Sequence, residues 1–223
     1  MLSKRLLTIA NLVPKDSNVV DIGCDHGYLL IYLKDIGFNG KLLGVDNKAG
    51  PINSFKENLK KKGYEKIIKY SLSCGLEDVD STYNAVVIAG MGFDNIKKII
   101  SEDINKLDFI NTFIVDSHTK EEETRKFFVS LGYLIEQEVI LKEDGIFYEI
   151  VKFKKGHKKY SKNDFMFGPE LLKERNQIFN EKWSFILNEY IGIIAKMPEK
   201  DKKYRDLESK ICEIKKIIIW YKK

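Results

Sequence analysis

Short apolar runs alternate with helical stretches through the first 155 residues, and this alternation limits the fold more than any other feature of the sequence. Near-continuous apolar runs predict buried strands at residues 18–22, 41–45, 84–89 and 109–115, and a weaker run predicts an edge strand at 66–72. Helical patterns occupy residues 28–36, 51–62, 94–100 and 120–131. Strands that alternate with helices predict an α/β fold, with a doubly wound parallel sheet and right-handed crossovers.

Both ends of this region depart from the alternation. Residues 134–141 and 147–153 predict two further strands, and the segment 142–145 between them, which contains Gly145, predicts a tight turn. The sheet is therefore expected to be mostly parallel and to end in an antiparallel hairpin. Ahead of the sheet, apolar residues spaced by four and three predict a short helix that begins near Ser3.

After residue 157 the apolar spacing changes to steps of four and three, over residues 179–197 and again over 204–221. This spacing predicts two helices with heptad-patterned apolar stripes. The short break around Pro198 predicts an antiparallel pair, because a parallel pair needs a long return connection. We therefore expect one domain over residues 1–156 and a coiled-coil helical hairpin over residues 157–223. The hairpin either projects from the sheet or packs on it as a helical subdomain.

Charge is distributed unevenly between these two parts. Residues 1–155 hold 22 Lys and Arg against 23 Asp and Glu, a net charge of −1, and residues 156–223 hold 16 against 10, a net charge of +6. A basic appendage on a neutral body is typical of proteins that bind polyanions such as nucleic acids, although a solvated helix face gives the same count.

Composition excludes several classes of protein. The cysteines are Cys24, Cys74 and Cys212, an odd and widely spaced set that excludes a disulfide scaffold and fits a reducing cytoplasm. The three histidines are not spaced as a metal cluster, so we expect no metal. No apolar run approaches the roughly 20 residues of a membrane helix, and the first residues lack a secretory signal pattern. We therefore expect a cytoplasmic protein that contacts no membrane.

The strongest local motif is residues 19–27, where a strand runs into a turn between Gly23 and Gly27 and then into a helix. Such a turn brings backbone N–H groups and a helix N-terminus to the switch point of the sheet. The turn lacks the glycine spacing of a pyrophosphate site and instead offers the carboxylates of Asp21 and Asp25, which suit a cationic ligand. S-adenosylmethionine (SAM) carries an ammonium and a sulfonium. The motif and the terminal hairpin thus favour a SAM methyltransferase over a dinucleotide dehydrogenase.

Two further motifs fall at strand ends on the same edge of the predicted sheet. Asp46 closes the strand at residues 41–45, where an acid accepts hydrogen bonds from a ribose diol; alternatively, Asp46 caps the helix that follows. Residues 89–92, Ala-Gly-Met-Gly, follow the strand at 84–89. The two glycines allow the backbone to approach a ligand closely, or form an ordinary strand-to-helix turn.

These motifs carry a resemblance to a known family. Residues 21–29, 44–51, 87–92, 141–151, 167–172 and 179–183 together resemble the bacterial tRNA (adenine-N1)-methyltransferases that modify adenosine 22 in the D-arm. The resemblance implies a Rossmann-like class I methyltransferase domain that binds SAM, followed by a coiled-coil domain, with tRNA as partner. It also implies methyl transfer to N1 of an unpaired adenosine. N1 carries a free lone pair at neutral pH, so positioning is expected to supply most of the acceleration.

The motifs, the resemblance and the charge of the helical hairpin together predict three groups of site residues. Asp25, His26 and Tyr28 are the expected catalytic residues: Asp25 orients cofactor or base, His26 offers a hydrogen bond or a proton path, and Tyr28 supports packing. His26 is alternatively a simple helix-start residue. The expected cofactor contacts are Asp21, Gly23, Cys24, Gly27, Asp46, Asn47, Cys74, Gly75, Leu76, Ala89, Gly90, Met91 and Gly92. The expected RNA contacts are Arg5, Lys200, Lys202, Lys203 and Arg205.

The sequence departs from the family pattern at three places. Phe93 stands where the family has the last glycine of Gly-Met-Gly-Gly, and Cys74 replaces an Asp or Asn that reaches the SAM adenine. Residues 116–118, Asp-Ser-His, replace Gln-Pro-Asn near the entrance for the target base. Two alternatives therefore stay open: a SAM methyltransferase with another acceptor, and a noncatalytic protein that binds SAM and RNA. The chain is expected to act as a monomer.

Overall fold

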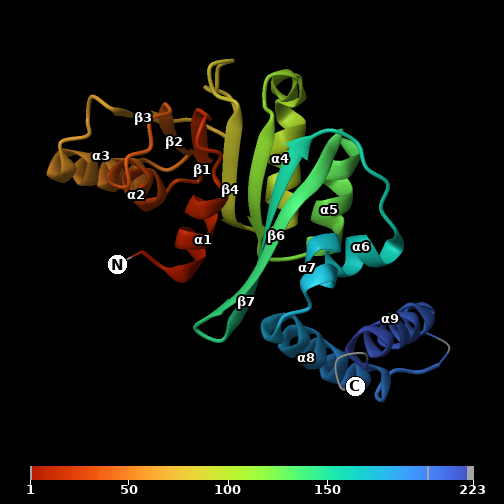
Figure 1. Ribbon diagram of the computed structural model, residues 1–223. Coiled ribbons are helices and arrows are strands. Elements are labelled where there is room, and N and C mark those ends of the chain that lie inside the picture. Colours follow the sequence, from red (N-terminus) through yellow and green to blue (C-terminus); the bar gives the residue numbers. More distant parts are fainter. Residues whose placement is uncertain (1, 200, 220–223) are drawn as a thin grey trace.

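The computed structural model describes residues 2–199 and 201–219, and a seven-stranded sheet lies at its centre (Figure 1). The strand order is β3-β2-β1-β4-β5-β7-β6; β1 to β5 are parallel, and β7 runs antiparallel to both β5 and β6. The predicted sheet with a terminal antiparallel hairpin is confirmed. The strands are β1 (Val19–Ile22), β2 (Leu42–Asp46), β3 (Ile68–Leu72), β4 (Ala85–Met91), β5 (Thr112–Ser117), β6 (Tyr133–Glu143) and β7 (Ile146–Lys155).

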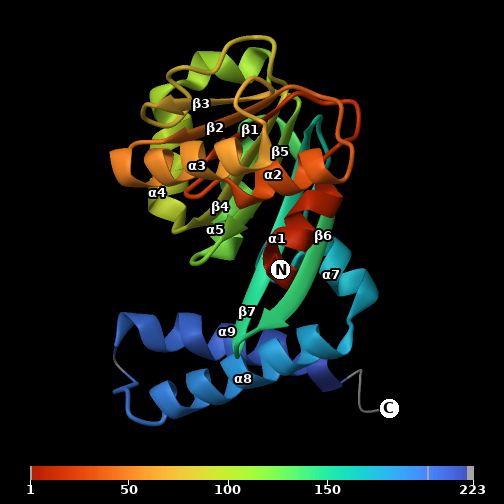
Figure 2. The same cartoon turned by 90° about the vertical axis from the view of Figure 1, so that its left-hand side faces the viewer.

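Helices cover both faces of this sheet (Figures 1 and 2). One face is covered by α1, α2 and α3, which bury Ile9, Leu30 and Phe55 against it. The other face is covered by α4 and α5, which bury Ile96 and Phe128. The bounds of these helices are α1 (Lys4–Leu12), α2 (Tyr28–Asp35), α3 (Ala49–Lys62), α4 (Phe93–Glu102) and α5 (Glu121–Ser130).

The N-terminal helix α1 begins where the sequence predicts it. The hydroxyl of Ser3 accepts a hydrogen bond from the N–H of Leu6 and caps the helix. The carboxylate of Glu143 accepts hydrogen bonds from the N–H groups of Lys4, at 2.6 Å, and of Arg5, at 3.4 Å. This carboxylate places negative charge at the positive end of the helix. Because Glu143 ends β6, it fixes α1 against the β6–β7 hairpin.

The strand predicted at residues 109–115 begins later than expected. The structure has a 3₁₀ helix at Ile104–Asp108 and begins β5 at Thr112. Leu107 and Ile110 are buried in the core outside any strand, so the apolar run is longer than the strand. The carbonyl of Ile110 accepts a hydrogen bond from the Tyr133 hydroxyl at 2.8 Å. The strand also ends later, and therefore contains Asp116 and Ser117.

Within its described residues the C-terminal part has four helices, and the last two pack against each other as the predicted hairpin (Figure 2). The root of this pair, the end nearest the sheet, packs against it. There Phe179, Trp183 and Ile214 form a buried cluster with Ile140 of β6. Farther along α8, Phe185 and Ile193 are exposed, so the structure combines packing at the root with extension beyond it. The second heptad pattern runs to Tyr221, which lies outside the described residues. The four helices are α6 (Lys162–Phe167), α7 (Pro169–Glu174), α8 (Gln177–Ile194) and α9 (Lys202–Ile219).

A buried ionic network joins the hairpin to the sheet. The guanidinium of Arg125 on α5 donates to Glu138 of β6, at 2.6 Å, and to Glu149 of β7. The ammonium of Lys182 on α8 donates to the same Glu149, at 2.9 Å, and to Glu121, at 2.8 Å. Loss of one member of such a network leaves an uncompensated buried charge. The predicted domain boundary at residues 156/157 falls between β7 and α6, and this network crosses it.

Candidate active site

A cavity of about 510 Å³ opens at the carboxyl ends of β1, β2 and β4. Nine of the predicted site residues line it: Gly23, Asp25, Asp46, Asn47, Cys74, Gly75, Ala89, Gly90 and Met91. The sequence therefore brings the strand-end motifs together at one site, as the parallel sheet requires.

The cavity also has a wall that the sequence analysis did not include. Asn95, Lys98, Ile99 and Glu102 of α4 line it, as do Ile22, Val45, Lys48, Pro51 and Ser73. The residues of α4 recur at steps of three and four, which places them on one face of the helix. In the sequence this spacing is also that of an ordinary solvated helix face, so no local signal distinguishes these residues.

Five of the predicted cofactor residues do not line the cavity: Asp21, Cys24, Gly27, Leu76 and Gly92. Cys24 and Leu76 are buried in the two cores on opposite faces of the sheet. At Gly27 an added Cβ would meet the ring of Phe55 at 1.9 Å, so this glycine allows close packing of the turn. Gly92 caps the N-terminus of α4.

The turn after β1 is held in a conformation that few side chains adopt. Gly23 has φ +72°, and an added Cβ there would lie 2.3 Å from Cε of Met91. Asp25 has φ +51°, in the left-handed region that Asp tolerates better than most residues. The N–H of Asp25 donates to Oδ2 of Asp46 at 3.3 Å. The turn is thus fixed to the end of β2.

Asp46 orients two loops and does not cap α3. Its Oδ1 accepts a hydrogen bond from the N–H of Lys48 at 2.9 Å, and the N-cap of α3 is Lys48, whose side chain makes no capping bond. The helix-cap alternative for Asp46 is therefore wrong. A carboxylate has about four acceptor positions, so two remain for hydroxyl groups in the cavity.

Asp21 lies beneath the turn in an unusual electrostatic environment. Its side chain is buried, with 6% of the residue exposed. Burial and the neighbouring Asp46 carboxylate raise the pKa of Asp21 to about 7, against the opposite effect of Arg5. A cation bound nearby would favour the ionised form of Asp21.

The three predicted catalytic residues lie together at the start of α2. His26 Nε2 is 3.5 Å from Oδ1 of Asp25, and the rings of His26 and Tyr28 have centroids 5.4 Å apart. Of the three, only Asp25 lines the cavity. Tyr28 is 52% exposed and its ring lies beside that of His26, so a role in packing stays a prediction.

The predicted RNA contacts differ in their surroundings. Arg5 is engaged in an ion pair with the buried Asp116. Lys203 and Arg205 are exposed at the start of α9. Lys200 and the side chain of Lys202 lie outside the described residues.

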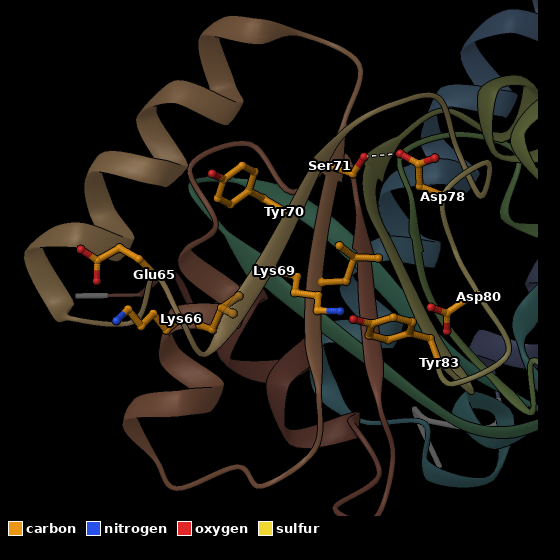
Figure 3. Close-up of a pocket in the computed structure, with 10 residues that line it drawn as sticks. Glu65, Lys66, Lys69, Tyr70, Ser71, Asp78, Asp80 and Tyr83 are labelled. Atoms are coloured by element: carbon orange, nitrogen blue, oxygen red, sulfur yellow. Dashed lines mark hydrogen bonds between the residues drawn. The ribbon is translucent and has the colours of Figure 1, made fainter.

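A second cavity, of about 460 Å³, lies on the edge strand β3 and holds no predicted site residue (Figure 3). Lys66, Lys69 and Tyr70 line it together with Asp78 and Asp80, and Ser71 donates a hydrogen bond to Asp78. It lacks the glycine turns and strand ends of the first cavity. The first cavity is therefore the candidate active site.

The donor set and size of the first cavity fit SAM. Its volume lies within the roughly 300–1,000 Å³ of small-molecule sites. The carboxylates of Asp25 and Asp46, with Asp21 beneath them, suit the ammonium and sulfonium, and Asp46 suits the ribose diol. Among the described residues, no group of three His, Cys, Asp or Glu side chains could hold a metal ion. In the described part of the chain, no helix has the length and apolarity needed to cross a membrane.

The strand order, the terminal hairpin and the acid-lined cavity at the carboxyl edge define a Rossmann-like SAM methyltransferase. A family profile for tRNA (adenine(22)-N(1))-methyltransferase, TrmK, matches residues 19–216. The chain belongs to this family, which confirms the predicted resemblance.

Individual relatives agree with this assignment over nearly their whole length. The tRNA (adenine(22)-N(1))-methyltransferase of Bacillus subtilis is 29% identical, over 97% of each chain. A Streptococcus pneumoniae relative solved with S-adenosyl-L-methionine is 31% identical, with a TM-score of 0.90, over 98% of this chain and 100% of its own. M. capricolum TrmK, solved with S-adenosyl-homocysteine, is 28% identical, with a TM-score of 0.88, over 98% of each chain.

Replacement of Asp46 by Asn tests its expected contact with the cofactor. The amide keeps the size of the side chain and one acceptor oxygen, so the bond from the Lys48 N–H can persist. The acceptor oxygen that serves the Asp25 N–H and the ribose is lost. We expect SAM binding to weaken by about 1–3 kcal/mol. Calorimetric titration measures it, with exposed Asp16→Asn as the control; unchanged affinity would remove Asp46 from the cofactor site.

Proposed function

We propose that this protein methylates N1 of adenosine 22 in tRNA, using SAM as the methyl donor. The observation that carries this proposal is the cavity formed by the glycine turn after β1, Asp46 and the bulge at Gly90, in a chain of this family. The bound cofactor supplies an activated methyl group, which N1 accepts through its lone pair.

In this proposal the chain's own residues bind and orient the reactants. Asp46 holds the ribose, and Asp21 and Asp25 provide negative charge toward the cationic end of the cofactor. The β4 strand has a bulge at Gly90, with φ +77°, which brings the backbone at the end of β4 to the cavity. His26 and Tyr28 stand beside Asp25 and are accessible to an unpaired base. The chemistry needs little proton transfer before methylation, so positioning supplies most of the rate.

The exposed Lys203 and Arg205 are proposed to contact tRNA phosphates, and residues 157–223 to form the tRNA-binding domain. The positive excess of this segment supports the proposal. A tRNA substrate also supports a cytoplasmic location. Action as a monomer stays a prediction.

Incubation of the full chain with labelled SAM and bulk unmodified tRNA tests the function, followed by mass-spectrometric mapping of the methylated base. The expected product is 1-methyladenosine at position 22. Methylation elsewhere would support the alternative of another acceptor. Binding of both SAM and tRNA without methyl transfer would support the noncatalytic alternative.

Cys74 offers a gain-of-function test of the cofactor site. Its thiol is exposed at the cavity and stands where the family has a carboxylate or amide that reaches the adenine. We expect Cys74→Asp to strengthen SAM binding by about 1 kcal/mol, because a strong acceptor replaces a weak one. Titration of SAM into both proteins measures it, and Cys212→Asp is the matched control on the exposed surface of α9. Weaker binding by Cys74→Asp would show that the adenine lies elsewhere.

A further inference from the structure

A second group of functional side chains lies on the β5 side of the cavity. Arg5 comes from α1, Asp116 from the end of β5, His118 from the residue directly after β5, and Tyr148 from β7. An added Cβ on Gly90, which lines the cavity, would lie 3.5 Å from Nη1 of Arg5 and 3.6 Å from Nε2 of His118. The N–H of His118 also donates to the carbonyl of Met91 at 3.0 Å. This group therefore borders the candidate active site directly.

Asp116 is the buried centre of the group. Its side chain is fully buried, and its Oδ2 accepts a hydrogen bond from Nη1 of Arg5 at 2.7 Å and lies 3.9 Å from Nε2 of His118. Its Oδ1 has no hydrogen-bond partner among the residues that the structure describes. A buried carboxylate with an unsatisfied oxygen lowers stability, and such groups persist most often where they have a function.

Two aromatic rings complete the group and remain accessible. The His118 and Tyr148 rings meet edge to face, with centroids 5.7 Å apart, and the Arg5 guanidinium lies 5.5 Å from the centre of the Tyr148 ring. The His118 side chain is 40% exposed and that of Arg5 is 23% exposed, whereas Asp116 is not exposed at all. The buried carboxylate thus binds the part-buried Arg5 and lies near the exposed His118 beside Gly90, without itself reaching a ligand.

We propose that His118 and Tyr148 contact the acceptor base, and that Asp116 is a positioning residue that fixes His118 and neutralises Arg5. This inference rests on the proposed function. A flat base that enters beside Gly90 meets an aromatic edge and an imidazole nitrogen that can accept a hydrogen bond from an exocyclic amine.

The charge balance of the group supports this assignment. Methylation at N1 leaves the adenine ring with a positive charge, and an unpaired Arg5 close by would repel that charge. Paired with Asp116, Arg5 contributes no net charge next to the product. Loss of the Asp116 charge should therefore slow the chemical step more than it weakens SAM binding.

Steady-state methylation of unmodified tRNA by the full chain tests the proposal with four variants. We expect His118→Ala to lower kcat about 10- to 100-fold, and His118→Asn, whose amide oxygen also accepts a hydrogen bond, to retain most of the activity. Asp116→Asn should lower kcat by a similar factor. Arg5→Gln combined with Asp116→Asn should recover part of that loss, because the unpaired positive charge is gone. The SAM dissociation constant should change less than twofold in the two His118 variants. In the double variant it should rise near pH 7, because loss of Arg5 removes a charge that lowers the pKa of Asp21.

The outcomes separate this inference from the proposed function. An inactive wild-type chain would refute the proposed function itself. An active wild type with His118→Ala within twofold of it in kcat and KM would overturn only the inference, as would equal losses in His118→Ala and His118→Asn. His157→Ala, at an exposed histidine near Gly132, is the matched control and should match the wild type. If Asp116→Asn does not fold, the comparison of His118→Ala with His118→Asn, both at an exposed side chain, tests the inference alone.

Discussion

Asp21→Asn is expected to stabilise the cofactor-free protein at pH 8 and at the same time to weaken its binding of SAM. The pKa of Asp21 is about 7 in the folded protein against 3.8 for an ordinary aspartate. Folding therefore opposes ionisation of Asp21. The resulting destabilisation of the wild-type fold is absent below pH 4, grows as the pH rises, and is complete above pH 7. The full difference amounts to about 4 kcal/mol, an upper bound on the stabilisation by Asn at pH 8.

The affinity should move in the opposite direction because the bound cofactor is cationic. An ionised Asp21 beneath the ammonium and sulfonium is replaced by a neutral amide, which should weaken SAM binding by about 1.5–3 kcal/mol, or 10- to 100-fold. In the wild type, affinity should fall as the pH drops below about 7, and this dependence should vanish in Asp21→Asn.

Thermal melting without cofactor and calorimetric titration with SAM, each at pH 6 and pH 8, measure both effects. Asp16→Asn, at an exposed aspartate of the α1–β1 loop, should change neither. Lower stability of Asp21→Asn at pH 8 would show that Asp21 is held ionised in the fold. Unchanged SAM affinity at pH 8 would show that its charge does not reach the cofactor.

The sequence predicts most of this architecture because the fold depends on local periodicity. Each predicted strand and helix exists, since apolar runs and helical stripes report burial directly. The same logic explains the error at β5, where Leu107 and Ile110 are buried without being in a strand. The six-residue helices α6 and α7 carry too few turns for a periodic pattern.

The candidate site was predictable where its residues end strands, and not where they come from a helix face or a distant ion pair. Asp46 and Gly90 follow strands, so topology alone brings them together. Asn95 and Lys98 of α4 look like an ordinary solvated face. The ion pair between Arg5 and Asp116 joins residues 111 positions apart, so no local sequence pattern predicts it.

Charge reversal on the helical hairpin is expected to abolish most tRNA binding. Lys196, Lys203, Arg205 and Lys215 are exposed and form no ion pair with other described residues. None belongs to the buried cluster at the hairpin root, so their replacement by Glu should leave the fold intact. Removal of the whole hairpin would be a poorer test, because it would remove Lys182 and leave Glu149 with one fewer partner in the core.

Each duplex phosphate contact contributes about 0.9 to the slope of log affinity against log salt, so the loss of two contacts should weaken binding about 60-fold at 0.1 M salt. Electrophoretic or fluorescence titration with tRNA at several salt concentrations measures both the affinity and the slope. SAM affinity should not change, because these side chains do not line the cavity.

The sheet domain offers a matched control with the same change in charge. Lys60, Lys61, Lys66 and Lys69 are also exposed and form no ion pair with the described residues, but they lie on α3 and at the β3 edge. Replacement of these four by Glu should weaken tRNA binding only through the general change in net charge and should leave the salt slope intact. If tRNA affinity fell only in the control variant, the tRNA contact would lie at the β3 edge. Normal affinity of the hairpin variant would leave α8 and α9 with a purely structural or protein-binding role.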